Sequence, residues 1–118
     1  RSPIHMALYF TTDNPQRLLD EFKKAIREGR IATWSYDEDG DFTHTPSQWN
    51  KQAWLKPSVE SNKLALYILA PKDTNLTSLV YSVYHGRFIE SVLLHCDDFF
   101  SNGTATAYPA GRDNVSHA

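Results

Sequence analysis

The segment Leu64–Ala70 most constrains the fold, because it is apolar at every position. Successive side chains of a β-strand point to opposite faces, so a strand of this composition is apolar on both. Such a strand is typical of the centre of a sheet that is covered on at least one side. We therefore expect a sheet built around this segment.

The residues before this segment predict one helix. Ala7–Thr11 is a short aromatic and apolar run typical of a strand. Asn14 followed by Pro15 is typical of a helix start, since asparagine caps free N–H groups and proline has none to lose. Apolar residues then recur with helical spacing over Pro15–Glu28, at Leu18, Leu19, Phe22, Ala25 and Ile26.

Several short strands follow. Ile31–Tyr36 alternates as a strand does, Asp39-Gly40 is a strong hairpin signal, and Phe42–Thr45 runs back. Gln52–Val59 is strand-like, but its proline, Pro57, cannot donate to a ladder and needs an edge or a bulge.

Two interpretations compete for Thr77–Phe100. One continuous helix would place Gly86 in its interior, at a cost of roughly 1 kcal/mol, and would contain several residues that favour strands. The interpretation we favour makes Ser78–Tyr84 a strand and starts a helix near Arg87. The apolar stripe of that helix would be Phe88, Ile89, Val92, Leu93, Cys96 and Phe99.

This order predicts an α+β fold with a mostly antiparallel sheet of five to seven strands and two amphipathic helices on one face. The element order is β-α-β-β-β-β-β-α-β, which resembles a ferredoxin-like plan with an extra hairpin. At 118 residues the chain has the length of one domain, over residues 6–108. We interpret residues 1–5 as an expression scar, because His5-Met6 is encoded by a common cloning site, and residues 109–118 as a flexible tail.

Composition excludes several functional classes. The net charge of −2 disfavours nucleic acid, whose phosphates attract basic proteins. The single cysteine excludes a disulfide framework and a multi-cysteine metal site. No apolar run reaches the roughly 18–20 residues of a membrane span, so we expect no membrane partner and a cytoplasmic protein.

The acidic turn Asp37–Asp41 superficially resembles a calcium loop. An EF-hand needs glycine at position six and glutamate at position twelve, but Phe42 and Gln48 occupy these positions. We interpret the turn as a solvated hairpin tip, and we expect neither a metal site nor a cofactor.

Two small-molecule sites are conceivable. In the first, His44, His85, His95 and Asp98 converge as acid–base groups of a small enzyme or binder. In the second, Tyr84, His85, Gly86 and Arg87 bind an anion, because free N–H groups gather where a turn enters a helix.

The hypothesis we favour is a non-enzymatic interaction protein. Two helices on one face leave the other sheet face exposed, and more strand positions are apolar than two helices can cover. We expect that second face to bind a protein partner, most simply another copy of the chain in a homodimer. Its candidate interface residues are Trp34, Trp49, Trp54, Tyr67 and Tyr81.

Overall fold

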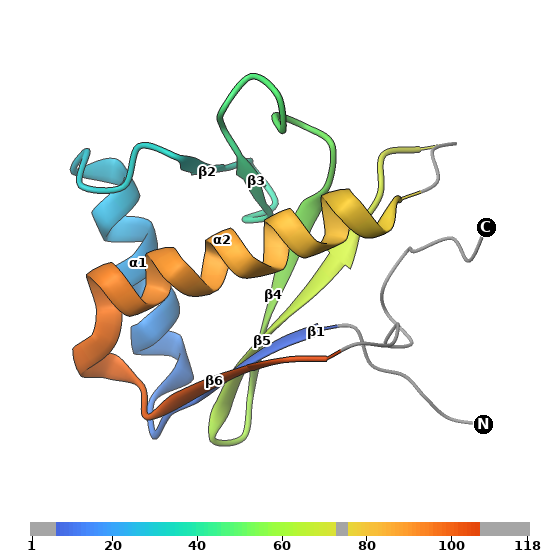
Figure 1. Cartoon of the computed structure of the whole chain (residues 1–118). Helices are drawn as coiled ribbons and strands as arrows, with labels where there is room; N and C mark the ends of the chain where they lie inside the picture. Colours follow the sequence, from blue (N-terminus) through green and yellow to red (C-terminus); the bar gives the residue numbers. More distant parts are fainter. Residues whose placement is uncertain (1–6, 73–75, 107–118) are drawn as a thin grey trace, which may run out of the picture.

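A six-stranded antiparallel sheet packs against two helices in the computed structural model, which describes residues 7–72 and 76–106. In chain order the elements are β1 (Ala7–Thr11), α1 (Pro15–Arg27), β2 (Trp34–Tyr36), β3 (Phe42–His44), β4 (Trp54–Glu60), β5 (Lys63–Leu69), α2 (Ser78–Cys96), the 3-10 turn η1 (Asp97–Phe99) and β6 (Asn102–Ala105). The predicted α+β class is confirmed (Figure 1). The expected scar at 1–5 and the expected tail at 109–118 lie outside the described residues.

The strands are ordered β2-β3-β4-β5-β1-β6. Within the part β4-β5-β1-β6, α2 joins β5 to β6, two strands that both pair with β1. This is the split βαβ arrangement that the element order predicts, with the hairpin β2–β3 added at one edge. The apolar strand β5 lies between β4 and β1, inside the sheet as expected.

The proline in β4 lies where a strand tolerates one. β3 pairs with β4 only at Phe42 and Leu55, so the edge of β4 from Pro57 onward faces no strand among the described residues. The missing N–H of the proline therefore costs the sheet no hydrogen bond.

Helix α1 forms where the sequence predicts it. The Asn14 side chain accepts a hydrogen bond from the Arg17 backbone N–H at 3.1 Å, and Pro15 occupies the first turn. The apolar stripe is buried at Leu18, Leu19, Phe22 and Ala25.

The favoured interpretation of residues 78–84 as a strand is wrong. These residues form the first turns of α2, a helix of 19 residues capped by Thr77, whose hydroxyl accepts a hydrogen bond from Val80 N–H at 3.2 Å. Both edges of β5 are already paired, so the strand that residues 78–84 would form has no place beside it. As a helix the segment buries Tyr81, Tyr84 and His85 instead, and this packing outweighs the strand preference of its residues.

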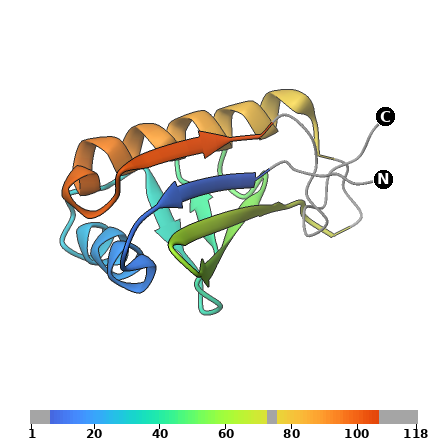
Figure 2. The same ribbon diagram turned by 90° about the horizontal axis from the view of Figure 1, so that it is seen from below.

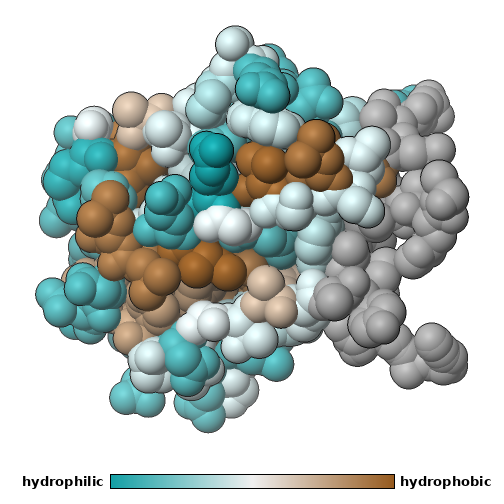
Figure 3. All heavy atoms as spheres, viewed as in Figure 1, coloured by the Kyte–Doolittle hydropathy of each residue, from teal (hydrophilic) through white to brown (hydrophobic). Residues whose placement is uncertain are grey.

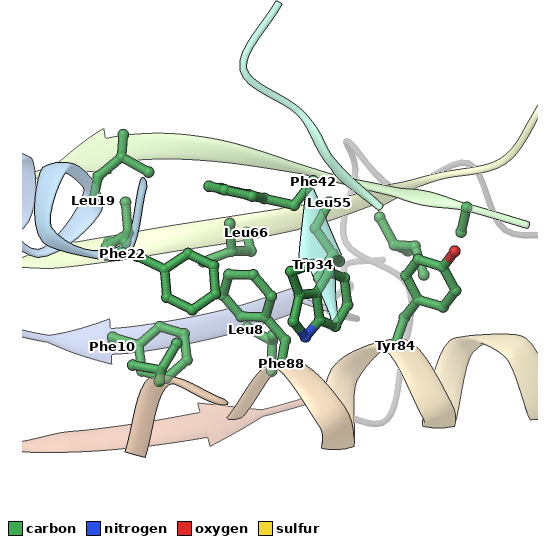
Figure 4. Packing of buried hydrophobic residues seen from close by; sticks show 14 of the residues in the cluster. Leu8, Phe10, Leu19, Phe22, Trp34, Phe42, Leu55, Leu66, Tyr84 and Phe88 are labelled. Atoms are coloured by element: carbon green, nitrogen blue, oxygen red, sulfur yellow. The ribbon is translucent and has the colours of Figure 1, made fainter. Parts of the chain in front are cut away.

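Phe88 of α2 lies at the centre of the core (Figure 4). Its ring is 4.7 Å from that of Phe22, 5.0 Å from Trp34, 5.5 Å from Phe42 and 6.2 Å from Phe10. It therefore contacts both helix and strand residues, and its burial fixes α2 against the sheet.

Strand β6 lies close over the same core and runs beside α2 in Figure 2. A Cβ atom on Gly103 would lie 2.9 Å from Cε1 of Phe10, closer than side-chain carbons approach. Glycine at this position therefore allows β6 to pair with β1 above the Phe10 ring.

The other side of the sheet, the helix-free face, carries mixed side chains. A small cluster of Ala7, Ala65 and Tyr67 is buried there, with Tyr9 against it. Neighbouring positions on β4 and β5 that register with this cluster are Trp54, Lys56, Ser58, Glu60, Lys63 and Leu69. Charged and polar groups thus interrupt the apolar surface that the sequence predicts on this face.

Replacing Phe88 with alanine should lower the free energy of unfolding by about 3–5 kcal/mol, because the cavity would open among four aromatic rings. Urea denaturation followed by circular dichroism measures this change. The control is Val59→Ala on β4, where the side chain is 45% exposed and about 0.5 kcal/mol or less is expected. Equal losses for the two variants would contradict the central position of Phe88.

Candidate functional site

The outward side of α2 carries apolar residues that face solvent. Leu79, Leu93 and Leu94 are 63%, 53% and 72% exposed, respectively, and Val83 is half-buried between them. The opposite side of the same helix is the buried side described above. We define the α2 outer face by its exposed and half-buried members: Leu79, Ser82, Val83, Gly86, Arg87, Glu90, Leu93 and Leu94.

The middle of this face has a shallow, open hollow beside a glycine. A depression of about 400 Å³ is lined by Ser82, Val83, Gly86, Arg87 and Glu90. A Cβ atom on Gly86 would meet no heavy atom within 4 Å, so nothing in the described chain requires glycine there. Glycine inside a helix costs roughly 1 kcal/mol relative to alanine.

The face has two apolar ends and a polar centre. Hydrophobic atoms gather in two groups along the course of α2 in Figure 3, with hydrophilic and neutral atoms between them. Leu79 lies toward one end of the helix, and Leu93 and Leu94 lie toward the other. The charged residues of the face are Arg87 and Glu90, so its formal charges cancel.

The histidines that the enzyme hypothesis brings together lie apart in the contacts of the structure. His44 is buried on β3, where Nδ1 lies 2.7 Å from the Thr33 carbonyl oxygen and the ring lies 4.5 Å from that of Trp34. His85 is buried on α2, with Nδ1 2.9 Å from the Tyr81 carbonyl oxygen and its ring stacked at 3.7 Å on Tyr81. No hydrogen bond or ring contact of the described residues joins the two.

His95 and Asp98 lie near the end of α2, half-buried and exposed, respectively. Asp98 lines a second hollow, of about 320 Å³, beside the start of α1, together with Thr12, Asn14, Arg17 and Phe99 among others. The Arg17 guanidinium lies 5.0 Å from the centre of the Phe99 ring, and the Thr12 hydroxyl donates to the Phe99 carbonyl at 2.7 Å. None of the three candidate histidines lines this hollow or the one at Gly86.

The predicted anion site is wrong in its premise. Tyr84, His85, Gly86 and Arg87 lie in the interior of α2, where backbone N–H groups are bonded within the helix. The Tyr84 hydroxyl contacts the Thr43 hydroxyl and the Trp49 carbonyl. Arg87 and Gly86 belong instead to the α2 outer face.

The predicted aromatic interface residues are dispersed. Trp34 is 1% exposed in the core, and Tyr81 lies on α2 rather than in the sheet, so neither can form a sheet-face interface. Trp49 is half-buried against the core. Only Trp54 and Tyr67 lie on the helix-free face.

Tyr67 is held by its neighbours on that face. Its hydroxyl donates to the Glu60 carboxylate at 3.0 Å, and Tyr9 meets its ring edge-on at 6.4 Å. Burial, followed by the bond to Glu60, raises the pKa of Tyr67. The Lys63 ammonium lies 4.7 Å from the centre of the Tyr9 ring. Residues of the same chain therefore already contact the two tyrosine rings of the helix-free face.

The acidic turn brings three aspartates together. One oxygen each of Asp37, Asp39 and Asp41 lie within 4.8 Å of one another. Oδ1 of Asp37 accepts the backbone N–H groups of Asp39 and Asp41, both at 3.0 Å. This turn motif explains the fold of the hairpin tip without an ion.

Comparison with protein-family models, with curated proteins and with solved structures finds no match to this chain. Of the two described helices, neither combines the length and the apolar character that crossing a bilayer needs. The case for a function therefore rests on the side chains themselves.

Sequence reasoning missed the exposed leucines. Leu93 was expected on a buried stripe, and Leu79 in a strand. The signal was present, since a continuous helix over residues 78–96 places Leu79, Gly86 and Leu93 on one line of its surface. The interpretation of residues 78–84 as a strand does not place these three residues on one surface, so it does not predict the face.

The buried histidines predict loss of stability in acid. Burial lowers the pKa of His85 from 6.5 to about 4, against the opposing effect of the Tyr81 carbonyl. Burial also lowers the pKa of His44. As the pH falls, the unfolded chain therefore takes up protons on these histidines at a higher pH than the folded chain does. The stability that the neutral histidines contribute is fully present above pH 6.5 and is lost as the pH drops from 6.5 toward 4. For His85 alone the loss amounts to roughly 3 kcal/mol.

Urea denaturation at a series of pH values tests this prediction. His85→Leu should flatten the decline of stability between pH 6.5 and 4, because one buried imidazole no longer takes up a proton. The control for a new leucine on α2 is His95→Leu. An unchanged slope in His85→Leu would contradict the assignment.

Proposed function

We propose that this chain acts by binding another protein, without catalysis, and that the partner contacts the α2 outer face. The observation that carries the proposal is the exposure of Leu79, Leu93 and Leu94 on a helix whose other side already fills the core. Isolated exposed leucines are ordinary, but several exposed leucines on one side of a helix favour a docking surface.

The energies support this choice. Burying one leucine side chain contributes about 1.5–3 kcal/mol, so three of them offer several kcal/mol toward association. Ordering and rigid-body losses oppose that gain. That cost is about 4–15 kcal/mol, so other contacts of the face must add to the contribution of the leucines.

The helix-free face is a weaker candidate than the sequence suggests. Its two best aromatic residues, Tyr9 and Tyr67, already contact Lys63, Glu60 and each other. The charged positions Lys56 and Glu60 lie among them. A partner would have to desolvate these charges, whereas the ends of the α2 outer face carry none.

Other classes gain less support. An enzyme built on His44, His85 and His95 would need them in one hollow, and they line neither of the two described above. A nucleic-acid partner would need basic residues, but the α2 outer face carries one arginine and one glutamate. A cytoplasmic location stays a prediction. Cys96 is buried and free, so the described fold needs no disulfide, which is compatible with a reducing compartment.

Site-specific photo-crosslinking in cells of the source organism tests the proposal. A benzophenone amino acid replacing Leu93 should form a crosslinked protein product, because position 93 would be covered by the partner. Adding Leu79→Ser should weaken that product, since the same partner would lose an apolar contact. Mass spectrometry of the product identifies what covers the face.

The matched control places the same amino acid at Lys56, which is exposed on the helix-free face. A product from position 56 and none from position 93 would favour the sheet face instead. No product from either position would contradict an interaction role for both faces.

A further inference from the structure

We propose that the partner on the α2 outer face is a second copy of this chain, bound with its α2 antiparallel and crossing at Gly86. This inference rests on the proposed function and names its partner. It follows from the symmetry of the residues along α2, from the hollow at Gly86 and from the charges beside it.

Two of the four apolar residues of the α2 outer face, Leu79 and Leu93, are spaced symmetrically about Gly86. Leu79 lies seven residues before Gly86, and Leu93 lies seven residues after it. Seven residues are almost two helical turns, so the three positions share one line along the helix. A two-fold axis through Gly86 therefore brings Leu79 of each copy against Leu93 of the other, as an isologous dimer requires.

The hollow fits a close crossing at the same point. Gly86 has no Cβ, and no heavy atom of the described residues lies within 4 Å of where one would be. Ser82 adds a second small side chain to the rim of the hollow. Small side chains at a crossing allow two helix backbones to approach closely. A second helix would thus use a glycine for which the single chain has no need.

The charged residues beside Gly86 are also compatible with an antiparallel crossing. Glu90 and Ser82 lie at equal distances on opposite sides of Gly86, so an antiparallel crossing sets each Glu90 against the Ser82 of the other copy. The two Arg87 and two Glu90, which we call the neutral group, carry formal charges that sum to zero. No acidic residue faces another across the crossing, which favours this pairing over one that aligns like charges.

The expected dimer is modest in size. One helix of 19 residues from each copy forms a smaller contact than a standard interface of roughly 1,200–2,000 Å². We therefore expect a dissociation constant in the micromolar range, measured by sedimentation equilibrium on the full chain.

Charge reversal tests the neutral group. Arg87→Glu would gather four negative groups and Glu90→Arg four positive ones, so each should raise the dissociation constant about tenfold or more. The double variant Arg87→Glu, Glu90→Arg restores neutrality and should recover most of the affinity. Single variants that dimerise as the unaltered chain does, or a double variant as weak as the singles, would overturn the proposal.

Gly86→Ala separates a role in association from a role in folding. The new methyl group has open space in the single chain and improves helix propensity, so thermal stability at high dilution should rise. The same methyl group would separate the two backbones at the crossing, so dimerisation should weaken. A variant that dimerises more tightly would contradict a crossing at this residue.

Disulfide trapping tests the antiparallel register. Under mild oxidation Gly86→Cys should crosslink with itself, because position 86 lies on the axis. Leu79→Cys alone should not, but a mixture of Leu79→Cys and Leu93→Cys chains should give the mixed dimer. Self-crosslinking of Leu79→Cys would show a parallel pair and overturn the arrangement.

The two proposals fail in different ways. If the pure chain stays monomeric at every concentration while position 93 crosslinks a different protein in cells, the interaction role stands and the homodimer is wrong. If the chain is monomeric and position 93 crosslinks nothing, both are wrong.

Discussion

The burial of Phe88 among four aromatic rings is the interaction on which the rest of the structure depends. It joins residues of α1, β1, β2 and β3 to one position of α2. One turn earlier, the Tyr84 hydroxyl bonds to Thr43 and to the Trp49 carbonyl, so a polar contact fixes the same helix. Together these residues set the rotation of α2 about its own axis. Once that rotation is set, Leu79, Gly86 and Leu93 must face outward.

With this rotation, the exposed leucines lie on α2 and not on the sheet. The exposed apolar surface that the sequence predicts on the helix-free face is interrupted there by charged and polar groups. Its location changes because residues 78–84 form a helix, which removes one strand from the sheet and adds an outward helix face. The helix-free face then needs less covering by a partner. Tyr9 and Tyr67 contact each other on it, and each also contacts a charged residue, Lys63 and Glu60, respectively.

The predictable parts of the fold were those with local signals. Asn14-Pro15 and the stripe from Leu18 define α1, and the apolar run from Leu64 defines an inner strand, because capping and periodicity depend on neighbouring residues. The conformation of residues 78–84 depends on whether an edge of β5 is free, which only the assembled sheet decides. The same holds for the site, since Gly86 was noticed as a turn residue and its place on an outward helix face appeared only with the complete helix.

The position of Gly86 shows why a helix can keep a residue that weakens it. A glycine in the middle of α2 costs roughly 1 kcal/mol, whereas loss of the Phe88 ring would cost about 3–5 kcal/mol. Tertiary packing of the inner side therefore determines whether α2 forms, and the outer side is free to vary within that margin. A surface used for association can then carry a glycine, exposed leucines and a compensated charge pair without endangering the fold. The residues that hold the helix and those that the proposed association would use lie on opposite sides of one element, and substitutions can separate the two roles.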